Sequence, residues 1–331
     1  MESSRVFFAA SDDRVKSVDF HPTEPLIAIG LMNGVVNVRN YEEDKIVHSI
    51  KVCTSPVRAA VFIVRKGWLV TGSDDKFVRV FEITTGKVIK EFEAHADFIR
   101  SIAVHPTQSF ILTAGDDKLI KQWNWDKDWA VEQIYEGHSH YVMQIAINPK
   151  ESDSFASASL DNSVKARPIS SVIWKIGTAA PSFTLEGHTK GVNCVSYYPV
   201  AGKRQSILVS GSDDQLVKVW DYDTKQCIKT LEGHSANVTS VRFHSTLPLI
   251  ISSAEEQGEK AGAVRIWNAE LLLGSGSYRL ESTINDDLGR AWCVAALNDT
   301  VAVGYDKGCV VHTIKKKTDV ESKDSLAKKT A

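Results

Sequence analysis

The stretch LVSGSDDQLVKVWD, residues 208–221, reads as a hydrophobic strand, an aspartate turn and a second strand that ends in tryptophan and aspartate. Weaker copies return elsewhere in the chain, as WLVTGSDDKFVRVFE (68–82), FILTAGDDKLIKQWN (110–124) and SFASASLDNSVKARP (154–168). Because the hairpin recurs along the chain, it indicates a repeated unit of architecture before it indicates an active site.

A second signal accompanies these hairpins, an alanine-histidine or glycine-histidine pair followed by alternating apolar residues. It reads EAHADFIRSIAVHP, EGHSHYVMQIAINP, EGHTKGVNCVSYYP and EGHSANVTSVRFHS, and the alternation predicts a strand each time. The histidines, His95, His138, His188 and His234, follow one another at intervals of 43, 50 and 46 residues. With the turn aspartate and the tryptophan-aspartate ending, the repeats resemble the WD-repeat family of β-propellers, which have a period of roughly 40 to 45 residues and four strands per blade.

This resemblance implies an all-β fold, a seven-bladed WD-repeat propeller. The expected units span about 11–50, 53–92, 95–135, 138–185, 188–231, 234–284 and 289–315. The segment RVFFAA, residues 5–10, is expected to supply the outer strand of the last blade and so to close the ring. We therefore expect a propeller domain over 1–315 and a flexible basic tail over 316–331.

The resemblance also implies roles for the most conspicuous polar residues. In WD repeats a histidine, a strand serine or threonine, the turn aspartate and the tryptophan form a buried hydrogen-bonded tetrad. In the unit quoted first these residues are His188, Ser210, Asp214 and Trp220. Recurrence of the aspartate–histidine pair in blade after blade favours this structural role over catalysis.

Several units depart from the pattern. The tryptophan position holds Arg39 in the first unit and Phe81 in the second. In the fourth unit we expect extra residues near 165–173, before Trp174, and in the sixth two excursions at 257–261 and 270–276. Insertions of this kind are tolerated at turns.

Composition narrows the class of function. The 39 basic and 41 acidic residues give a net charge of −2, so the chain lacks the global basic field that nucleic-acid binding requires. The five cysteines are scattered without CxxC spacing, which argues against a disulfide framework or a metal site. With no nucleophile elbow, phosphate-binding glycine loop or long apolar run, we expect a cytoplasmic, non-enzymatic protein with no cofactor and no direct membrane insertion.

Residues at one rim of the propeller can be predicted from the phase of the repeats, that is, from the position that each residue holds within its own repeat. The position after the first apolar residue of each innermost strand holds Lys16, Arg58, Arg100, Met143, Asn193, Thr239 and Trp292. Acidic residues near the same rim are Asp97 and the first aspartate of each DD pair, Asp74, Asp116 and Asp213, while Arg14 adds a cation. Such a rim suits a short ligand that carries both a carboxylate and ammonium groups, for example a peptide C-terminus with nearby lysines.

A more specific resemblance follows from the runs DRVKSVDFHPTEP, PVRAA, FIRSIAVHPT, HYVMQIAINPK, FASASLDN, FTLEGH, GVNC and YRLEST. From about residue 11 to 311 they resemble the N-terminal propeller of the beta-prime coatomer family, which belongs to the coat of Golgi-to-endoplasmic-reticulum vesicles and binds C-terminal dilysine signals (KKxx or KxKxx) of membrane cargo. The resemblance implies that Arg14 and Lys16 hold the peptide carboxylate. It implies that Asp97, Asp116 and Asp213 take the lysine ammoniums. Arg58 and Arg100 would lie in the same pocket, and other coatomer subunits and Golgi membranes would be neighbours.

Two departures keep an alternative open. The family usually has an aromatic residue where this chain has Met32, so cargo preference is expected to be weaker or altered. Family members also continue into a second propeller and a helical solenoid, so the sequence represents either a paralogue without the coat-assembly region or part of a longer chain. The alternative is a general scaffold or substrate adaptor that has lost dilysine recognition.

Overall fold

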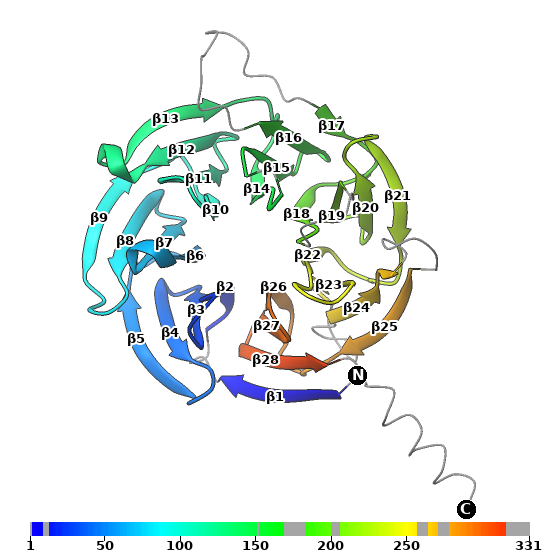
Figure 1. Ribbon diagram of the computed structural model, residues 1–331, viewed down its shortest axis with the longest axis horizontal. Coiled ribbons are helices and arrows are strands. Elements are labelled where there is room, and N and C mark those ends of the chain that lie inside the picture. The colour runs from blue at the N-terminus through cyan, green and yellow to red at the C-terminus, as the bar shows by residue number, and fades with distance from the viewer. Residues whose placement is uncertain are drawn as a thin grey trace, which may run out of the picture.

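The computed structural model describes residues 2–8, 13–150, 152–168, 183–199, 206–256, 264–270 and 278–315, with the backbone alone for 2–8, 167–168 and 315. These residues form seven four-stranded antiparallel sheets arranged in a ring (Figure 1). The predicted all-β, seven-bladed propeller is confirmed. The expected tail, 316–331, lies outside the described residues.

In each of the first three blades, the strands follow one another outward from the centre in chain order. Blade 1 contains β2 (Val15–Phe20), β3 (Leu26–Leu31), β4 (Val35–Asn40) and β5 (Lys45–Lys51). Blade 2 contains β6 (Val57–Ile63), β7 (Trp68–Ser73), β8 (Phe77–Glu82) and β9 (Val88–Glu93). Blade 3 contains β10 (Ile99–Val104), β11 (Phe110–Gly115), β12 (Ile120–Asn124) and β13 (Ala130–Tyr135). Short 3-10 helices, η1 (Val64–Lys66) and η2 (Trp125–Lys127), follow β6 and β12.

The remaining blades repeat this order. Blade 4 contains β14 (Val142–Ile147), β15 (Ser154–Ser159), β16 (Val164–Pro168) and β17 (Phe183–Leu185). Blade 5 contains β18 (Val192–Tyr197), β19 (Ile207–Ser212), β20 (Val217–Asp221) and β21 (Gln226–Leu231). Blade 6 contains β22 (Val238–Phe243), β23 (Leu249–Ala254), β24 (Val264–Asn268) and β25 (Arg279–Ile284). Blade 7 contains β26 (Ala291–Leu297), β27 (Thr300–Tyr305), β28 (Gly308–Lys315) and, from the start of the chain, β1 (Glu2–Phe8).

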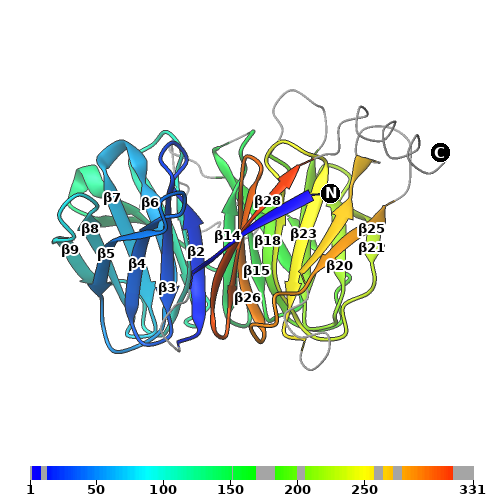
Figure 2. The same ribbon diagram turned by 90° about the horizontal axis from the view of Figure 1, so that it is seen from below.

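Strand β1 pairs antiparallel with β28 and so joins the beginning of the chain to the last blade. The register runs from Glu2 opposite Lys315 to Phe8 opposite Cys309. Figure 2 shows β1 lying obliquely across the side of the disc, next to β28. The strand therefore starts earlier than the RVFFAA segment indicates, and residues 9–12 lie outside the described residues.

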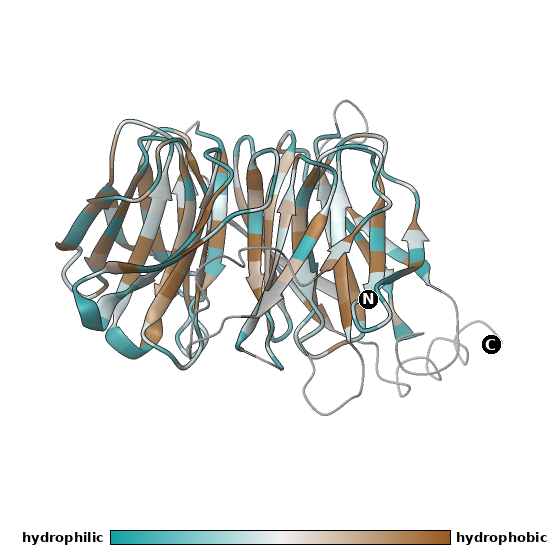
Figure 3. Cartoon of the chain, turned by 90° about the horizontal axis from the view of Figure 1, so that it is seen from above, coloured by the Kyte–Doolittle hydropathy of each residue, from teal (hydrophilic) through white to brown (hydrophobic). Residues whose placement is uncertain are grey.

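The apolar core is divided among the interfaces between neighbouring blades. One cluster packs Val36 of blade 1 with Leu69 of blade 2, and another packs Val15 of blade 1 with Ala302 of blade 7. All residues of β3, β11, β19 and β23 are buried, because the second strand of a blade is covered on both faces. Figure 3 shows apolar residues concentrated along the strands. Each blade therefore depends on its two neighbours for burial of its apolar surface.

The predicted tetrad is present in blade 5. His188 Nδ1 lies 2.8 Å from Asp214 Oδ2, His188 Nε2 lies 2.8 Å from Ser210 Oγ, and Trp220 Nε1 donates to the same hydroxyl at 2.8 Å. Blade 6 differs, because Glu256 takes the aspartate position and accepts a hydrogen bond from Arg265 Nη1 at 2.7 Å. In blade 5 the buried polar side chains of the tetrad thus satisfy one another.

The predicted insertion in blade 4 was misplaced. Strands β15 and β16 pair without a register shift, and Arg167 lies opposite Phe155 just as Trp220 lies opposite Leu208 in blade 5. Arg167 therefore occupies the tryptophan position, and the extra residues follow β16. Residues 169–182, with Trp174, lie outside the described residues, as do 257–263 and 271–277, which contain most of the two sixth-unit excursions.

Candidate functional site

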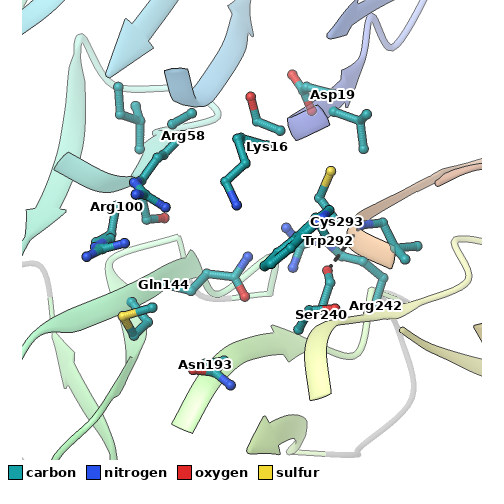
Figure 4. A pocket seen from close by; sticks show the side chains of 18 of the residues that line it. Lys16, Asp19, Arg58, Arg100, Gln144, Asn193, Ser240, Arg242, Trp292 and Cys293 are labelled. Carbon is teal, nitrogen blue, oxygen red and sulfur yellow. Dashed lines mark hydrogen bonds between the residues drawn. The ribbon is translucent and has the colours of Figure 1, made fainter. Parts of the chain in front are cut away.

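The inner strands of the seven blades enclose a central channel with a cavity of about 510 Å³. Its wall contains the second residue of every innermost strand. These seven rim residues are Lys16, Arg58, Arg100, Met143, Asn193, Thr239 and Trp292. They are the set that the phase of the repeats predicts. Figure 4 shows Lys16 extending into the channel beside Trp292, with Arg58 and Arg100 to one side.

Each rim residue is the extra residue of a β-bulge. In blade 1 the register between the first two strands shifts between Val15 and Ser17, and in blade 2 it shifts between Val57 and Ala59. The other five blades shift at the equivalent place. A β-bulge leaves its extra residue unpaired in the hydrogen-bond ladder and changes the direction in which its side chain points. The repeated bulge therefore directs one side chain per blade toward the channel.

A second residue of each blade lies beside the rim residue. It directly follows the blade's second strand, and its backbone N–H donates to a carbonyl just before the innermost strand, as from Asp74 to Pro56 at 3.1 Å and from Glu255 to Asn237 at 3.0 Å. These seven turn residues are Met32, Asp74, Asp116, Leu160, Asp213, Glu255 and Asp306. Each blade thus presents one pair, a rim residue and a turn residue.

In blades 2 and 3 this pair is a two-pronged ion pair. Arg58 donates to Asp74 through Nε and through Nη2, the latter at 2.7 Å. Arg100 donates to Asp116 from Nε at 2.6 Å and from Nη2 at 2.5 Å. Such bidentate pairs are among the strongest charge-assisted hydrogen bonds. Of the three rim cations, Lys16, Arg58 and Arg100, two are therefore neutralised by the turn residue of their own blade.

In blades 5 and 7 the turn residue accepts a hydrogen bond from a neutral rim side chain. Asn193 Nδ2 donates to Asp213 Oδ1 at 2.7 Å, and Trp292 Nε1 donates to Asp306 Oδ1 at 2.8 Å. Asp213 consequently keeps its negative charge at the channel. The negative charge of Asp306 is instead neutralised by two arginines, since Arg14 Nε donates to Oδ1 at 2.7 Å and Arg290 Nε donates to Oδ2 at 3.2 Å.

The pairs in blades 1, 4 and 6 contain no ion pair. Blade 4 has two apolar side chains, Met143 and Leu160. Blade 1 places Lys16 beside Met32, a methionine that is 40% exposed, and blade 6 places Glu255 beside a threonine. One cation and one carboxylate are therefore left without an opposite charge in their own blade.

Lys16 and Arg14 share the indole ring of Trp292. Lys16 Nζ lies 3.7 Å from the ring centroid and the Arg14 guanidinium carbon lies 4.7 Å from it, so both make cation–π contacts. Burial, together with the charges of Arg58 and Arg14, lowers the pKa of Lys16 from 10.5 to about 8. An anion that reached this corner would relieve the repulsion and favour the charged form of Lys16.

The acids expected from the sequence are not equivalent in the structure. Asp213 lines the channel, whereas Asp116 lies beside it with both carboxylate oxygens held by Arg100. Asp97 lies in the loop before β10 and accepts a hydrogen bond from the Phe98 backbone N–H at 2.8 Å. The sequence reasoning missed Glu255 and Asp306, although both directly follow a second strand, the same place as the first aspartate of each DD pair.

The depressed pKa of Lys16 should make binding of an anionic ligand sensitive to pH. Because this pKa is about 8, the ammonium loses its proton as the pH rises through that value. We expect the Kd of a peptide with a free carboxylate to rise about tenfold between about pH 7 and 9, measured by fluorescence anisotropy. A Lys16→Arg variant stays charged over this range, and an equally steep loss in that variant would contradict the assignment to Lys16.

The part of the chain that the structure describes shows no cluster of three metal-ligating side chains. Nor does any helix within the described ranges combine the length and apolar character needed to cross a bilayer.

Comparison with known proteins gives one family and a set of close relatives. The family described as "WD domain, G-beta repeat" matches residues 44–82, 86–124, 129–166, 179–221 and 225–268. The chain is 51% identical over 321 residues to coatomer subunit beta' of Homo sapiens, and 50% identical over 321 residues to that of Rattus norvegicus. It is 45% identical over 318 residues to a probable coatomer subunit beta' of Schizosaccharomyces pombe. These matches cover 96% of this chain but only 33% or 37% of the relatives, so the chain spans about a third of their length.

Proposed function

The chain belongs to the WD-repeat family of β-propellers, and on that premise we propose that its channel rim binds C-terminal dilysine signals, KKxx or KxKxx, of membrane cargo. The observation that carries the proposal is the separation of unneutralised charge around the channel. Lys16 is a cation without a carboxylate in its own blade, whereas Asp213 and Glu255 keep negative charge on blades 5 and 6. A peptide end with a carboxylate and nearby ammonium groups complements this arrangement.

The similarity to coatomer subunits beta' supports a vesicle-coat context for this binding. We propose a non-enzymatic module for Golgi-to-endoplasmic-reticulum retrieval, which acts from the cytoplasm and is peripherally associated with Golgi membranes and coat vesicles. Association with other coatomer subunits belongs to the same proposal, since the chain spans only a third of those relatives.

The residue roles in this proposal start at the corner that Trp292 forms. Arg14 and Lys16 would receive the peptide carboxylate there, each as a charge-assisted hydrogen-bond donor. Asp213 would receive a lysine ammonium directly. Asp97 and Asp116 would serve as further ammonium contacts, Asp116 through the lone pairs that Arg100 leaves free.

The expected affinity suits reversible capture. Hydrogen bonds to charged groups contribute roughly 1.5–3 kcal/mol each, and ordering a flexible tail offsets part of that gain. Three or four such contacts leave on the order of micromolar affinity, which should weaken as salt is added.

Titration with a fluorescent peptide ending in KKxx tests the proposal. We expect micromolar binding that falls at least about tenfold when the peptide C-terminus is amidated or when both lysines are replaced by norleucine, since either change removes one class of charge. An Asp97→Ala/Asp116→Ala double variant is expected to bind more weakly. Absence of binding by a protein with a cooperative thermal melt would contradict the proposal.

One observation favours a second candidate, a general scaffold or substrate adaptor that has lost dilysine recognition. Met32 stands where the beta-prime family usually has an aromatic ring, so the first blade offers flexible apolar contact without a ring face or hydroxyl. A Met32→Tyr variant that alone bound the KKxx peptide would support this candidate.

A further inference from the structure

One residue farther along the innermost strands than the rim, the channel wall becomes a second polar layer. In six blades the third strand residue lines the same cavity, as Ser17, Ala59, Ser101, Gln144, Ser240 and Cys293. Figure 4 shows Gln144 extending into the channel from one side, with Ser240 on the other side near Trp292. This layer has hydrogen-bonding groups but none of the charges of the rim.

Three side chains of this layer use an oxygen atom to bind the neighbouring blade. Ser101 Oγ and Ser240 Oγ each accept a hydrogen bond from a backbone N–H of the next blade at 3.2 Å, and Gln144 Oε1 accepts one at 2.8 Å. The two hydroxyl hydrogens and the Gln144 amide nitrogen have no acceptor among the residues that the structure describes. Ser101 and Ser240 are only 8% and 5% exposed, and groups so buried usually find a partner. Each of these side chains therefore still has a hydrogen to donate into the channel.

An arginine adds positive charge to these donors. Arg242, the fifth residue of β22, is partly buried and lines the cavity, and its Nη1 donates to the Val241 carbonyl oxygen at 3.1 Å. Within the described part of the chain this is the one hydrogen bond of a guanidinium that has five N–H groups, and it forms no ion pair there. A cation in an enclosed channel is costly unless an acceptor reaches it.

The acid nearest this layer in the strand pattern is a poor counterion for Arg242. Asp19, the fifth residue of β2, lines the cavity, and its Oδ2 accepts a hydrogen bond from the Phe62 backbone N–H at 3.0 Å. Burial raises the pKa of Asp19 to about 7, so much of it is protonated at neutral pH. The other acids of the cavity, Asp213 and Glu255, are turn residues of the rim. The positive charge of Arg242 is therefore largely available to a ligand.

We propose that Arg242 and Ser240, with Gln144 and Ser101 on the opposite wall, form a binding site for a phosphate-type oxyanion inside the channel. A guanidinium can donate to two oxygens of one phosphate, and hydroxyl and amide groups can donate to the others directly or through water. Arg242 lies three residues beyond the rim position of its strand, about 10 Å along the channel wall. This anion site is thus separate from the carboxylate site proposed at Lys16 and goes beyond the proposed function.

Titration calorimetry of the folded wild-type chain with inorganic phosphate, in Tris chloride at constant ionic strength, tests the site. We expect saturable binding with a Kd on the order of 1 mM or tighter, and a melting temperature that rises with phosphate concentration. Glycerol 3-phosphate, tested in the same way, tells the two sources of such an oxyanion apart: binding would extend the site to phosphate monoesters, and no binding would restrict it to the free anion. Neither saturable heat nor a phosphate-dependent rise in the melting temperature would overturn the proposal.

Two variants locate the anion. Arg242→Gln removes the charge and should weaken phosphate binding at least about tenfold. Gln144→Glu keeps an oxygen for the backbone N–H of Val195 but replaces the amide donor with a negative charge, so a loss of similar size is expected even if Arg242→Gln does not fold. Arg279→Gln makes the same change of charge on the exposed outer strand β25 of blade 6 and should bind phosphate within about twofold of wild type.

The same titrations separate this site from the rim. If Lys16→Met loses phosphate binding and Arg242→Gln retains it, the anion binds at the rim and the assignment to Arg242 is overturned. If the KKxx peptide does not bind but phosphate does, the proposed function fails and this inference stands, because the phosphate titration uses no peptide.

Discussion

Replacing Lys16 by methionine is expected to weaken binding of a KKxx peptide by roughly ten- to a hundredfold, the equivalent of one charge-assisted hydrogen bond. Lys16 is the rim cation that no carboxylate of its own blade neutralises, and its ammonium lies 3.7 Å from the Trp292 ring centroid. Methionine keeps an unbranched apolar stem against that ring, so packing is largely preserved. Fluorescence anisotropy with free-acid and amidated peptides would show whether the lost affinity depends on the C-terminal carboxylate of the peptide.

The amidated peptide is the internal control for this variant. Lys16→Met should leave its affinity within about twofold of the wild-type value, because the group that Lys16 recognises is already absent. Lys16→Arg should retain most of the binding of the free acid. Equal losses for both peptides would show that Lys16 acts through the shape of the channel and not through its charge.

A matched pair of substitutions at Met32, the turn residue beside Lys16, tests the role of the Lys16 charge in a second way. Met32→Asp gives blade 1 the acid that blades 2 and 3 have at this position, so it should capture Lys16 and reproduce much of the loss seen in Lys16→Met. Met32→Asn has nearly the same shape without the charge and should retain binding. Indistinguishable affinities for the two Met32 variants would argue against the blade-by-blade pairing scheme.

The ring of rim residues could be predicted from the sequence because every blade repeats the same local structure. Counting from the first apolar residue of an innermost strand reaches the bulge residue in all seven blades. The count does not depend on loop lengths or on irregular outer strands. It therefore identified Lys16, Arg58 and Arg100 even though the first two blades lack the tryptophan.

The charge state of the rim could not be predicted in the same way, because it depends on which neighbours meet. Arg14 bonds to Asp306, 292 positions away along the chain, and that contact exists only once the ring is closed. Glu255 was missed because blade 6 carries two glutamates where the pattern shows two aspartates. In blade 4 the search for a tryptophan led to Trp174, although the register places Arg167 at that position.

The paired acids of the turns divide two tasks between adjacent residues. In blade 5 the first, Asp213, faces the channel and accepts a hydrogen bond from Asn193. The second, Asp214, accepts hydrogen bonds from His188 at 2.8 Å and from the backbone N–H of Leu216 at 3.0 Å. Because the core needs only the second acid, the first position is not restricted to one residue type, and the seven turn residues include methionine, leucine, aspartate and glutamate.

Asp214→Ala is consequently expected to lower the free energy of unfolding by about 3 kcal/mol, because it leaves the buried imidazole of His188 and two backbone N–H groups without an acceptor. Besides His188 and Leu216, the backbone N–H of Thr189 also loses its acceptor. In the wild-type protein it donates to Asp214 Oδ2 at 3.0 Å. Asp213→Ala is the matched control, one residue away, and should cost about 1 kcal/mol or less because it removes a single partly exposed hydrogen bond. Urea denaturation followed by circular dichroism would measure both, and equal losses would contradict the division of tasks.

The destabilisation of Asp214→Ala should also depend on pH in a defined direction. Hydrogen bonds from His188 and from backbone amides outweigh burial and lower the pKa of Asp214 from 3.8 to about 2. Because the folded-state pKa lies below the unfolded one, the stabilisation is fully present above pH 3.8 and is lost as the pH falls through about 2. The stability gap between wild type and Asp214→Ala should therefore narrow between pH 4 and pH 2, whereas a constant gap would show that the carboxylate contributes through packing and not through its charge.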